Sequence, residues 1–150
     1  MAFLSSLDIS GSALTAQRLR MDVISQNIAN ANTTRAENGE AYRRRAVVFS
    51  ERPGTARFSA FLNRAQEEQR DQVAGRGVVV SSIETDMSDF KIEYDPSHPD
   101  ADEDGYVRYP NVNEVTEMVD MMAATRAYEA SITALNATKN MALKALEIGR

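Results

Sequence analysis

Apolar residues in the first part of the chain recur at the spacing of an amphipathic helix. Between residues 3 and 31 they alternate in steps of four and three along one face, with a few polar interruptions. The positions that repeat every seven residues are Leu7, Leu14, Met21 and Ile28. A seven-residue repeat sustained over several turns is typical of a helix that packs lengthwise against another helix. The pattern therefore predicts a long helix over residues 1–34 that needs a partner.

A second seam occupies the end of the chain, after Pro110. No glycine or proline occurs between Asn111 and Ile148, and Asn111 with Glu114 three residues later resembles the capping box of a helix start. The residues of this seam are again three or four apart: Met118, Met121, Thr125, Tyr128, Ile132, Leu135, Lys139, Ala142 and Leu146. They predict a helix over residues 111–150, similar in length to the first.

The middle of the chain, residues 35–110, has another pattern. It contains every proline and most of the glycines, and three runs of β-branched or aromatic residues lie among them: Ala46–Phe49, Gly77–Ile83 and Phe90–Tyr94. Such short runs, bounded by turn residues, predict strands. The expected fold class is α+β. Long N- and C-terminal helices pair as an antiparallel coiled-coil-like unit, and a small β-rich segment lies between them.

Two paired helices bury little apolar surface. At about 25 cal/mol per Å², the seam of such a pair barely offsets the conformational entropy that is lost when its residues become ordered. We therefore expect the two ends of the chain to be weakly folded alone and to be completed by other copies or by partner proteins.

Composition narrows the class of protein. The 150 residues are 43% hydrophobic and carry a formal net charge of −5, which suits one domain and argues against nucleic acid as a partner. No apolar run approaches the ~18 residues that a membrane span requires. The absence of cysteine excludes disulfides and thiol catalysis. The start, MAFLSSLDIS, lacks the basic and continuous apolar regions of a cleavable secretory signal.

Acidic residues are concentrated in one loop, Asp100–Gly105. Its alternating aspartates and its glycine match the first half of an EF-hand calcium loop, but Asn111 stands where that loop needs a bidentate glutamate. A calcium-binding module and a solvated acidic turn both stay open. The single histidine, His98, lies between two prolines, and nothing pairs a base with a nucleophile, so we expect no enzyme activity, metal or cofactor. The basic run Arg43–Arg45 is expected to flank a strand and offset nearby acids.

Several stretches are long and unusual enough to compare with a known family. The first helix ends in ISQNIANANTT, and the second half contains DPSHP, DGYVRYPNVN, RAYEA and MALKALEIG. These stretches resemble the rod and hook proteins of the bacterial flagellum, and those of the second half resemble the basal-body rod proteins in particular. The resemblance covers roughly residues 3–34 and 77–150.

The resemblance implies a structural subunit of the proximal rod, in the flagellar basal body. Such a subunit is made in the cytoplasm, exported by the flagellar type III apparatus, and polymerised through its terminal helices to transmit torque. The implied partners are further copies, other rod proteins, the protein at the junction of rod base and MS ring, and the export apparatus, without nucleic acid or membrane insertion. In related proteins a phenylalanine followed four residues later by an apolar residue signals export, and Phe3 and Leu7 match this pattern.

The seams and the asparagine-rich helix end give the expected subunit-packing residues. They are Leu14, Met21, Ile24, Asn27, Ile28, Asn30, Asn32, Met118, Met121, Tyr128, Ile132, Leu135 and Leu146. Asparagine is a weak helix former, because its amide competes for nearby backbone groups. We expect the three asparagines to hydrogen-bond across polar contacts between subunits; the alternative is that they simply end the helix.

Overall fold

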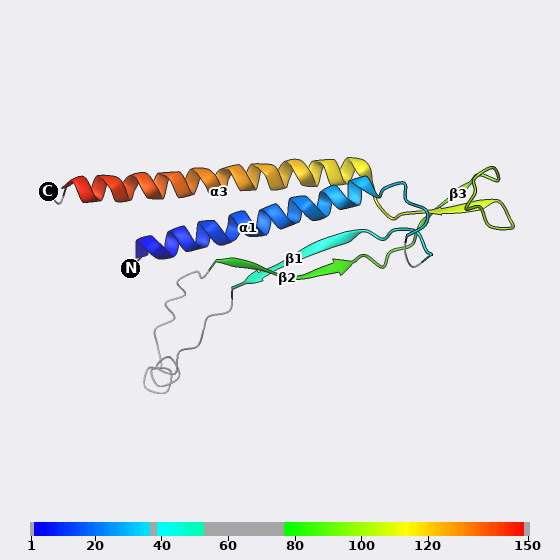
Figure 1. Cartoon of the computed structure of the whole chain (residues 1–150), viewed down its shortest axis with the longest axis horizontal. Helices are drawn as coiled ribbons and strands as arrows, with labels where there is room; N and C mark the ends of the chain where they lie inside the picture. The colour runs from blue at the N-terminus through cyan, green and yellow to red at the C-terminus, as the bar shows by residue number, and fades with distance from the viewer. Residues whose placement is uncertain (1, 37–38, 53–76, 149–150) are drawn as a thin grey trace, which may run out of the picture.

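The computed structural model describes residues 2–36, 39–52 and 77–148, and within these ranges the chain has an α+β fold in three layers (Figure 1). Helix α1 (Ala2–Ala29) lies in the middle, with helix α3 (Glu114–Ile148) along one side and a two-stranded ribbon along the other. A second two-stranded hairpin projects past the end of the helix pair, away from the start of α1. The predicted fold class is confirmed.

The two helices run antiparallel, as predicted. Asn27, near the end of α1, lies beside Glu117 near the start of α3, whereas Met21 lies beside Thr125. Helix α1 has 28 residues and α3 has 35, which correspond to ~42 Å and ~52 Å at about 1.5 Å per residue. The last turns of α3 therefore extend past the start of α1 (Figure 1).

Both helices are shorter than predicted at the ends that adjoin the middle segment. The N-cap of α3 is Asn113, whose Oδ1 accepts hydrogen bonds from the backbone N–H groups of Val115 (3.1 Å) and Thr116 (3.3 Å). The predicted capping box at Asn111 is therefore wrong. The side chain of Asn111 cannot cap the helix because it binds elsewhere, as described below.

The ribbon that covers α1 consists of β1 (Arg45–Glu51) and β2 (Val78–Thr85), which pair antiparallel. Gly77 precedes β2 with a φ of +88°, and a Cβ at this position would collide with the hydroxyl of Ser12 in α1. That hydroxyl accepts a hydrogen bond from the N–H of Val78 at 3.1 Å. The close approach fixes the ribbon against α1, and both strands lie where the sequence predicts them.

The projecting hairpin pairs β3 (Lys91–Tyr94) antiparallel with β4 (Tyr106–Tyr109). The sequence predicts β3 but misses β4, which is short and follows the acidic loop. One face of the hairpin packs inward: Val107 is fully buried, and the Lys91 ammonium donates to the carbonyl of the buried Val112 at 2.9 Å. The other face is exposed.

The helix interface includes alternate residues of the predicted seam of α3 and otherwise lies one position away from that seam. Glu117 and Ala124 are buried, and Met121 and Tyr128 are half-buried, so these four residues face α1. Met118 is 55% exposed and lies outside the interface. The prediction holds for Met121 and Tyr128 and fails for Met118, because apolar residues occupy two sides of α3 and spacing alone does not say which side faces the partner.

The buried residues of α1 and of the turn after it coincide only in part with the predicted seam, to which Ile24 and Ala31 belong. The buried residues are Ala16, Val23, Ile24, Asn27 and Ala31. The reason is that α1 is covered on two sides, by α3 and by the ribbon, so its buried face is wider than one seam. None of the helices in the described ranges is long and apolar enough to cross a membrane.

Candidate functional site: a buried polar junction and exposed apolar helix faces

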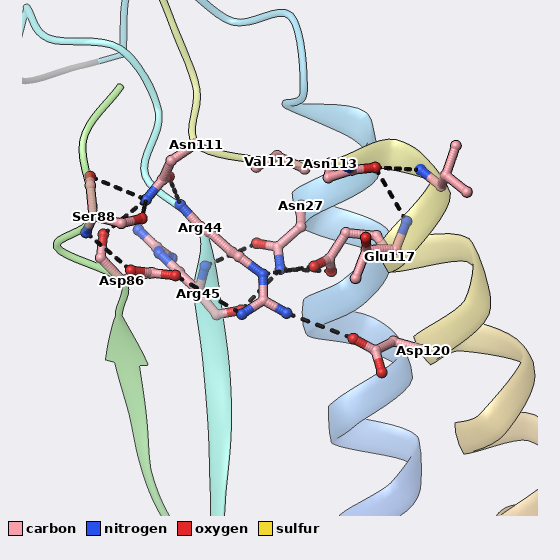
Figure 2. A network of polar contacts seen from close by, with 12 residues as sticks. Asn27, Arg44, Arg45, Asp86, Ser88, Asn111, Val112, Asn113, Glu117 and Asp120 are labelled. Carbon is pink, nitrogen blue, oxygen red and sulfur yellow. Dashed lines mark hydrogen bonds and ion pairs between the residues drawn. The ribbon is translucent and has the colours of Figure 1, made fainter. Parts of the chain in front are cut away.

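Polar side chains gather where α1 ends, α3 begins and the chain enters β1 (Figure 2). We call this cluster the polar junction. Its members are Arg20, Asn27, Tyr42, Arg44, Asp86, Ser88, Asn111, Glu117 and Asp120. Asn27 and Glu117 are only 0% and 1% exposed. Buried polar groups are costly unless they are hydrogen-bonded, so the partners of these two residues decide whether the junction stabilises the fold.

The amide of Asn27 forms all its hydrogen bonds with groups of the same chain. Its Nδ2 donates to the carbonyl of Arg45 (2.8 Å) and to Glu117 Oε2 (3.0 Å). Its Oδ1 accepts from the N–H of Arg45 (3.0 Å) and from the Tyr42 hydroxyl (2.9 Å). Burial raises the pKa of Tyr42 above its ordinary value, which further favours the protonated hydroxyl that donates to Asn27. The amide thus pairs with the backbone of β1 as a neighbouring strand would, and it also anchors α3.

Glu117 is an acid in the helix interface, and Arg44 balances it. Arg44 Nε donates to Glu117 Oε1 at 2.7 Å, and Nη2 of the same guanidinium lies 3.6 Å from Asp120 Oδ2. The hydrogen bond with Glu117 raises the pKa of Arg44 above its ordinary value, against the opposing effect of burial. A buried charge with a hydrogen-bonded partner is tolerated, whereas removal of one partner is strongly destabilising.

Asn111 closes the junction on the side of the ribbon. Its Oδ1 accepts from the N–H of Arg44 (2.8 Å), and its Nδ2 donates to Ser88 Oγ (2.8 Å) and to the carbonyl of Asp86 (3.1 Å). It therefore joins the entry of β1 to the segment that follows β2. The basic run at the start of β1 offsets nearby acids, as predicted, since Arg44 also lies 4.0 Å from Asp86 Oδ2.

These contacts change the interpretation of the asparagine-rich helix end. The sequence assigned Asn27 to contacts between subunits, but the structure places its hydrogen bonds inside one subunit. Asn30 lies in the turn after α1, where its Nδ2 donates to the carbonyl of Gln26 (2.9 Å) and its Oδ1 accepts from the Thr33 hydroxyl (3.2 Å). Asn32 is exposed in the same turn. For Asn30 and Asn32, a role in subunit contacts stays a prediction.

Apolar side chains remain exposed on the face of α3 that points away from α1. We call the group near its start the outer stripe: Val115, Met118, Val119 and Met122, which are 71%, 55%, 61% and 57% exposed. At about 100° per residue these four span an arc of about 100°, roughly opposite the buried Glu117 and Ala124. Exposed apolar groups of this kind mark protein contact surfaces.

A cleft of about 200 Å³ opens between α1 and β1, beside the polar junction. Its apolar lining is Val23, Ile24, Ala46, Val47 and Phe49, and its charged lining is Arg20, Arg44, Arg45, Glu117 and Asp120. The outer stripe points away from α1, so the stripe and the cleft of one chain do not meet. The chain thus carries an exposed apolar face and a cleft on different sides.

The remaining predicted site residues lie at different depths. Ile24 is buried; Leu7, Leu14, Met21, Ile28, Met121, Tyr128 and Leu135 are half-buried; Met118, Ile132 and Leu146 are exposed. The side chain of Phe3 lies outside the described part of the chain. The structure therefore brings most of the expected residues into the helix pair and leaves three on its surface.

The acidic loop forms the tip of the projecting hairpin. Asp100 Oδ2 accepts a hydrogen bond from the Thr34 hydroxyl at 2.7 Å, and Asp102 lies 3.8 Å from Arg108. Among the residues that the structure describes, no three or more histidine, cysteine or acidic side chains are grouped to hold a metal ion. The calcium alternative stays a prediction, and a calorimetric titration with millimolar calcium tests it: no heat would remove it.

Family models match both ends of the chain. Residues 7–36 match flagella basal body rod protein, and residues 103–148 match the C-terminal part of flagellar basal body rod FlgEFG protein. The flagellar basal-body rod protein FlgC of Bacillus subtilis is 52% identical over 97% of both chains. The chain belongs to the FlgC family of flagellar basal-body rod proteins. FlgC of Borreliella burgdorferi is 46% identical over 99% of this chain and 98% of that one, and FlgC of Salmonella typhimurium 39% over the whole of both.

Membership of the FlgC family confirms the resemblance seen in the sequence. The chain is a structural component of the flagellar basal body and not an enzyme. The two matched segments fall on α1 and α3 and contain Asn27 and Glu117. Sequence reasoning missed Glu117, although an acid between the seam residues of an amphipathic helix was a usable signal.

Proposed function

We propose that this FlgC-family chain polymerises through its two helices into the proximal rod and transmits torque along it. The outer stripe is the observation that supports the proposal most directly. Its four apolar side chains are more than half exposed on a long helix whose opposite face is already packed. Apolar surface of this kind favours a protein partner over water.

The expected packing residues divide between two tasks under this proposal. Buried and half-buried ones, such as Ile24 and Tyr128, hold α1 against α3 within the subunit. The exposed ones, Met118, Ile132 and Leu146, contact neighbouring subunits. Those neighbours are further copies, other rod proteins and, at the rod base, the protein that joins the rod to the MS ring.

Torque transmission requires a subunit that keeps its shape under load. The polar junction supports this role, because it ties α1, α3 and β1 together through hydrogen bonds of fixed direction. Its central amide and carboxylate, Asn27 and Glu117, are shielded from water. Low effective dielectric strengthens such bonds relative to the surface.

Assembly is tested by a charge on the outer stripe. Val119→Asp leaves the monomer folded, with a free energy of unfolding within about 0.5 kcal/mol of the wild type, because the side chain is already exposed. The same change abolishes rod formation, measured as basal bodies recovered from cells that carry the variant. Ala123 is also exposed on α3 but lies outside the outer stripe, so Ala123→Asp is the matched control. Cells with this control should yield more basal bodies than cells with Val119→Asp. Motile cells with normal rods from Val119→Asp would reject the proposal.

Export by the flagellar type III apparatus is the second part of the proposal, with Phe3 and Leu7 as its signal. Phe3→Ala with Leu7→Ala should lower the secreted fraction of the protein, measured by immunoblotting of cells and medium. Ile9→Ala removes an apolar side chain that is 36% exposed from the same helix and should leave secretion unchanged. Equal secretion of the double variant and the wild type would remove these two residues from the export signal.

A further inference from the structure

The aspartate that opens the acidic loop contacts a segment far away in the sequence. Asp100 Oδ2 accepts a hydrogen bond from the Thr34 hydroxyl at 2.7 Å, although the two residues are 66 positions apart. We propose that Asp100 is a positioning residue: its bond with Thr34 is a clasp that holds the projecting hairpin in one direction relative to the helix pair. Assembly of the rod requires that direction, and this second part rests on the proposed polymerisation.

The carboxylate of Asp100 is held in place for this contact. The N–H of Asp100 donates to His98 Nδ1 at 3.1 Å, and Asp100 Oδ1 lies 3.9 Å from Arg35 Nη1. The side chain of Arg35 is 74% exposed, so solvent screens this ion pair and it contributes little. The hydrogen bond from Thr34 is short and ends on a carboxylate, which makes it the stronger contact. The clasp therefore depends on Thr34 more than on Arg35.

The loop around Asp100 is attached to the strands of the hairpin. The ring of His98 lies edge-on to the ring of Tyr109, with centroids 6.2 Å apart, although Tyr109 is at the end of β4 farthest from the loop. The loop therefore folds back along the hairpin. Its second half is joined to the start of β4, where the N–H of Asp102 donates to the carbonyl of Tyr106 at 2.9 Å. A contact that holds Asp100 thus also holds the strands.

The turn that carries Thr34 is attached to the polar junction. The carbonyl of Thr33 accepts a hydrogen bond from the N–H of Tyr42 at 3.1 Å, and the Tyr42 hydroxyl donates to Asn27. Ala31 in the same turn is only 7% exposed. The clasp therefore connects the hairpin to the buried cluster that joins α1 to α3.

The other contacts of the hairpin restrict its direction less. Val107 is fully buried, but burial of an apolar side chain is favourable in many orientations. The Lys91 ammonium donates to the carbonyl of Val112 at the end of a long, flexible side chain. The hydrogen bond between Thr34 and Asp100 joins two short side chains, so it fixes the direction more closely.

The direction of the hairpin decides where its exposed face points. That face carries Ile92, Tyr94 and Tyr106, which are 65%, 67% and 47% exposed. Tyrosine is enriched at protein interfaces. A hairpin that is already held in one direction meets a neighbouring subunit without further ordering, which lowers the entropic cost of association.

Pulsed EPR between two spin labels measures the direction of the hairpin in the purified chain. The chain has no cysteine, so Ile92→Cys on β3 and Ala123→Cys on α3, both exposed, carry the labels. The labelled parent should give one narrow distance. Thr34→Val removes the donor and should raise the population of displaced hairpins about tenfold, since a hydrogen bond to a charged group corresponds to roughly that factor.

Matched variants separate the clasp from general damage to the loop. Thr34→Ser keeps the hydroxyl and should retain the narrow distance, whereas Asp100→Ala should broaden it as Thr34→Val does. Asp102→Ala removes an acid of the same loop that lies 3.8 Å from Arg108 within the hairpin, and it should leave the distance narrow.

A second pair of labels, at Arg18→Cys and Ala123→Cys, reports the helix pair and should give the same distance in every variant. If this distance is lost in Thr34→Val, the variant has unfolded and Asp100→Ala decides instead. A broad hairpin distance already in the labelled parent overturns the clasp. A narrow one in both Thr34→Val and Asp100→Ala overturns it too.

Basal bodies recovered from cells that carry the unlabelled variants test the second part. Their number should fall with Thr34→Val and Asp100→Ala and should stay normal with Thr34→Ser. Displaced hairpins with normal rods overturn the requirement for one direction and leave the proposed polymerisation intact. Failure of the polymerisation itself shows in the Val119→Asp experiment, as normal rods despite the added charge.

Discussion

Both amide hydrogens of Asn27 and both lone pairs of its amide oxygen form hydrogen bonds with protein groups. Two of them belong to the backbone of Arg45, and the others are the Tyr42 hydroxyl and Glu117 Oε2. In an isolated helix this residue competes for backbone groups and weakens the helix. Here Asn27 forms hydrogen bonds with the backbone of Arg45, at the start of β1, and with Glu117 of α3. A poor helix former therefore stabilises the contacts that join α1, α3 and β1.

Replacement of Asn27 by alanine tests this account at the residue scale. Asn27→Ala leaves the N–H of Arg45 and the Tyr42 hydroxyl without their acceptor in a buried site, and the free energy of unfolding should fall by about 2–3 kcal/mol. Asn30→Ala is the matched control: it loses a bond to Gln26 in an exposed turn and should cost less than about 0.5 kcal/mol. Urea unfolding followed by circular dichroism measures both. Equal losses from the two variants would contradict an internal role for Asn27.

The junction also shows where prediction from the sequence stops at this scale. That Asn27 is special was visible, because asparagine inside a helical seam needs a reason. Its partners were not visible, since Arg45 and Glu117 lie 18 and 90 positions away and only the fold brings them together. Asn111 was misassigned for the same reason: its real partners, Arg44 and Ser88, come from other segments.

At the scale of elements, two alanine substitutions test which face of α3 packs against α1. Ala124 is fully buried in the interface, whereas Ala123 beside it is exposed. Ala124→Leu should push the helices apart and lower the free energy of unfolding by about 1–3 kcal/mol through overpacking. Ala123→Leu adds the same atoms to the surface and should change it by less than about 0.5 kcal/mol. Thermal unfolding of both variants would refute the assigned register if Ala123→Leu were the more damaging.

Long elements were predictable and short ones less so. Helices α1 and α3 were foreseen because their apolar pattern extends over many turns, and β1 and β2 because β-branched runs stand between turn residues. Strand β4 has four residues, YVRY, and gains its order from pairing with β3 and from burial of Val107. Its alternation was too short to distinguish from a loop. The exposed apolar side of α3 misled the seam assignment because its residues have the same helical spacing as those that face α1.

At the scale of the whole molecule, support for α3 is uneven along its length. Its start is held by the polar junction and by α1, but residues 143–147 are all exposed, and the helix extends past the start of α1. A helix end without tertiary contacts is marginal in water. The expectation that the ends are weakly folded alone stays a prediction, and for α3 it now applies to the last turns, where the exposed residues lie.

Hydrogen exchange measured by mass spectrometry tests this uneven support in the purified monomer. Amides of residues 141–147 should exchange much faster than those of residues 117–128, because opening of the last turns breaks few contacts whereas opening near Glu117 breaks the junction. In isolated basal bodies the slow segment should stay slow, and the fast segment should slow down as neighbouring subunits cover Leu143 and Leu146. Protection of both segments already in the monomer would mean that the subunit needs no neighbour to complete α3. Fast exchange of both in the monomer would mean that the junction itself forms only on assembly.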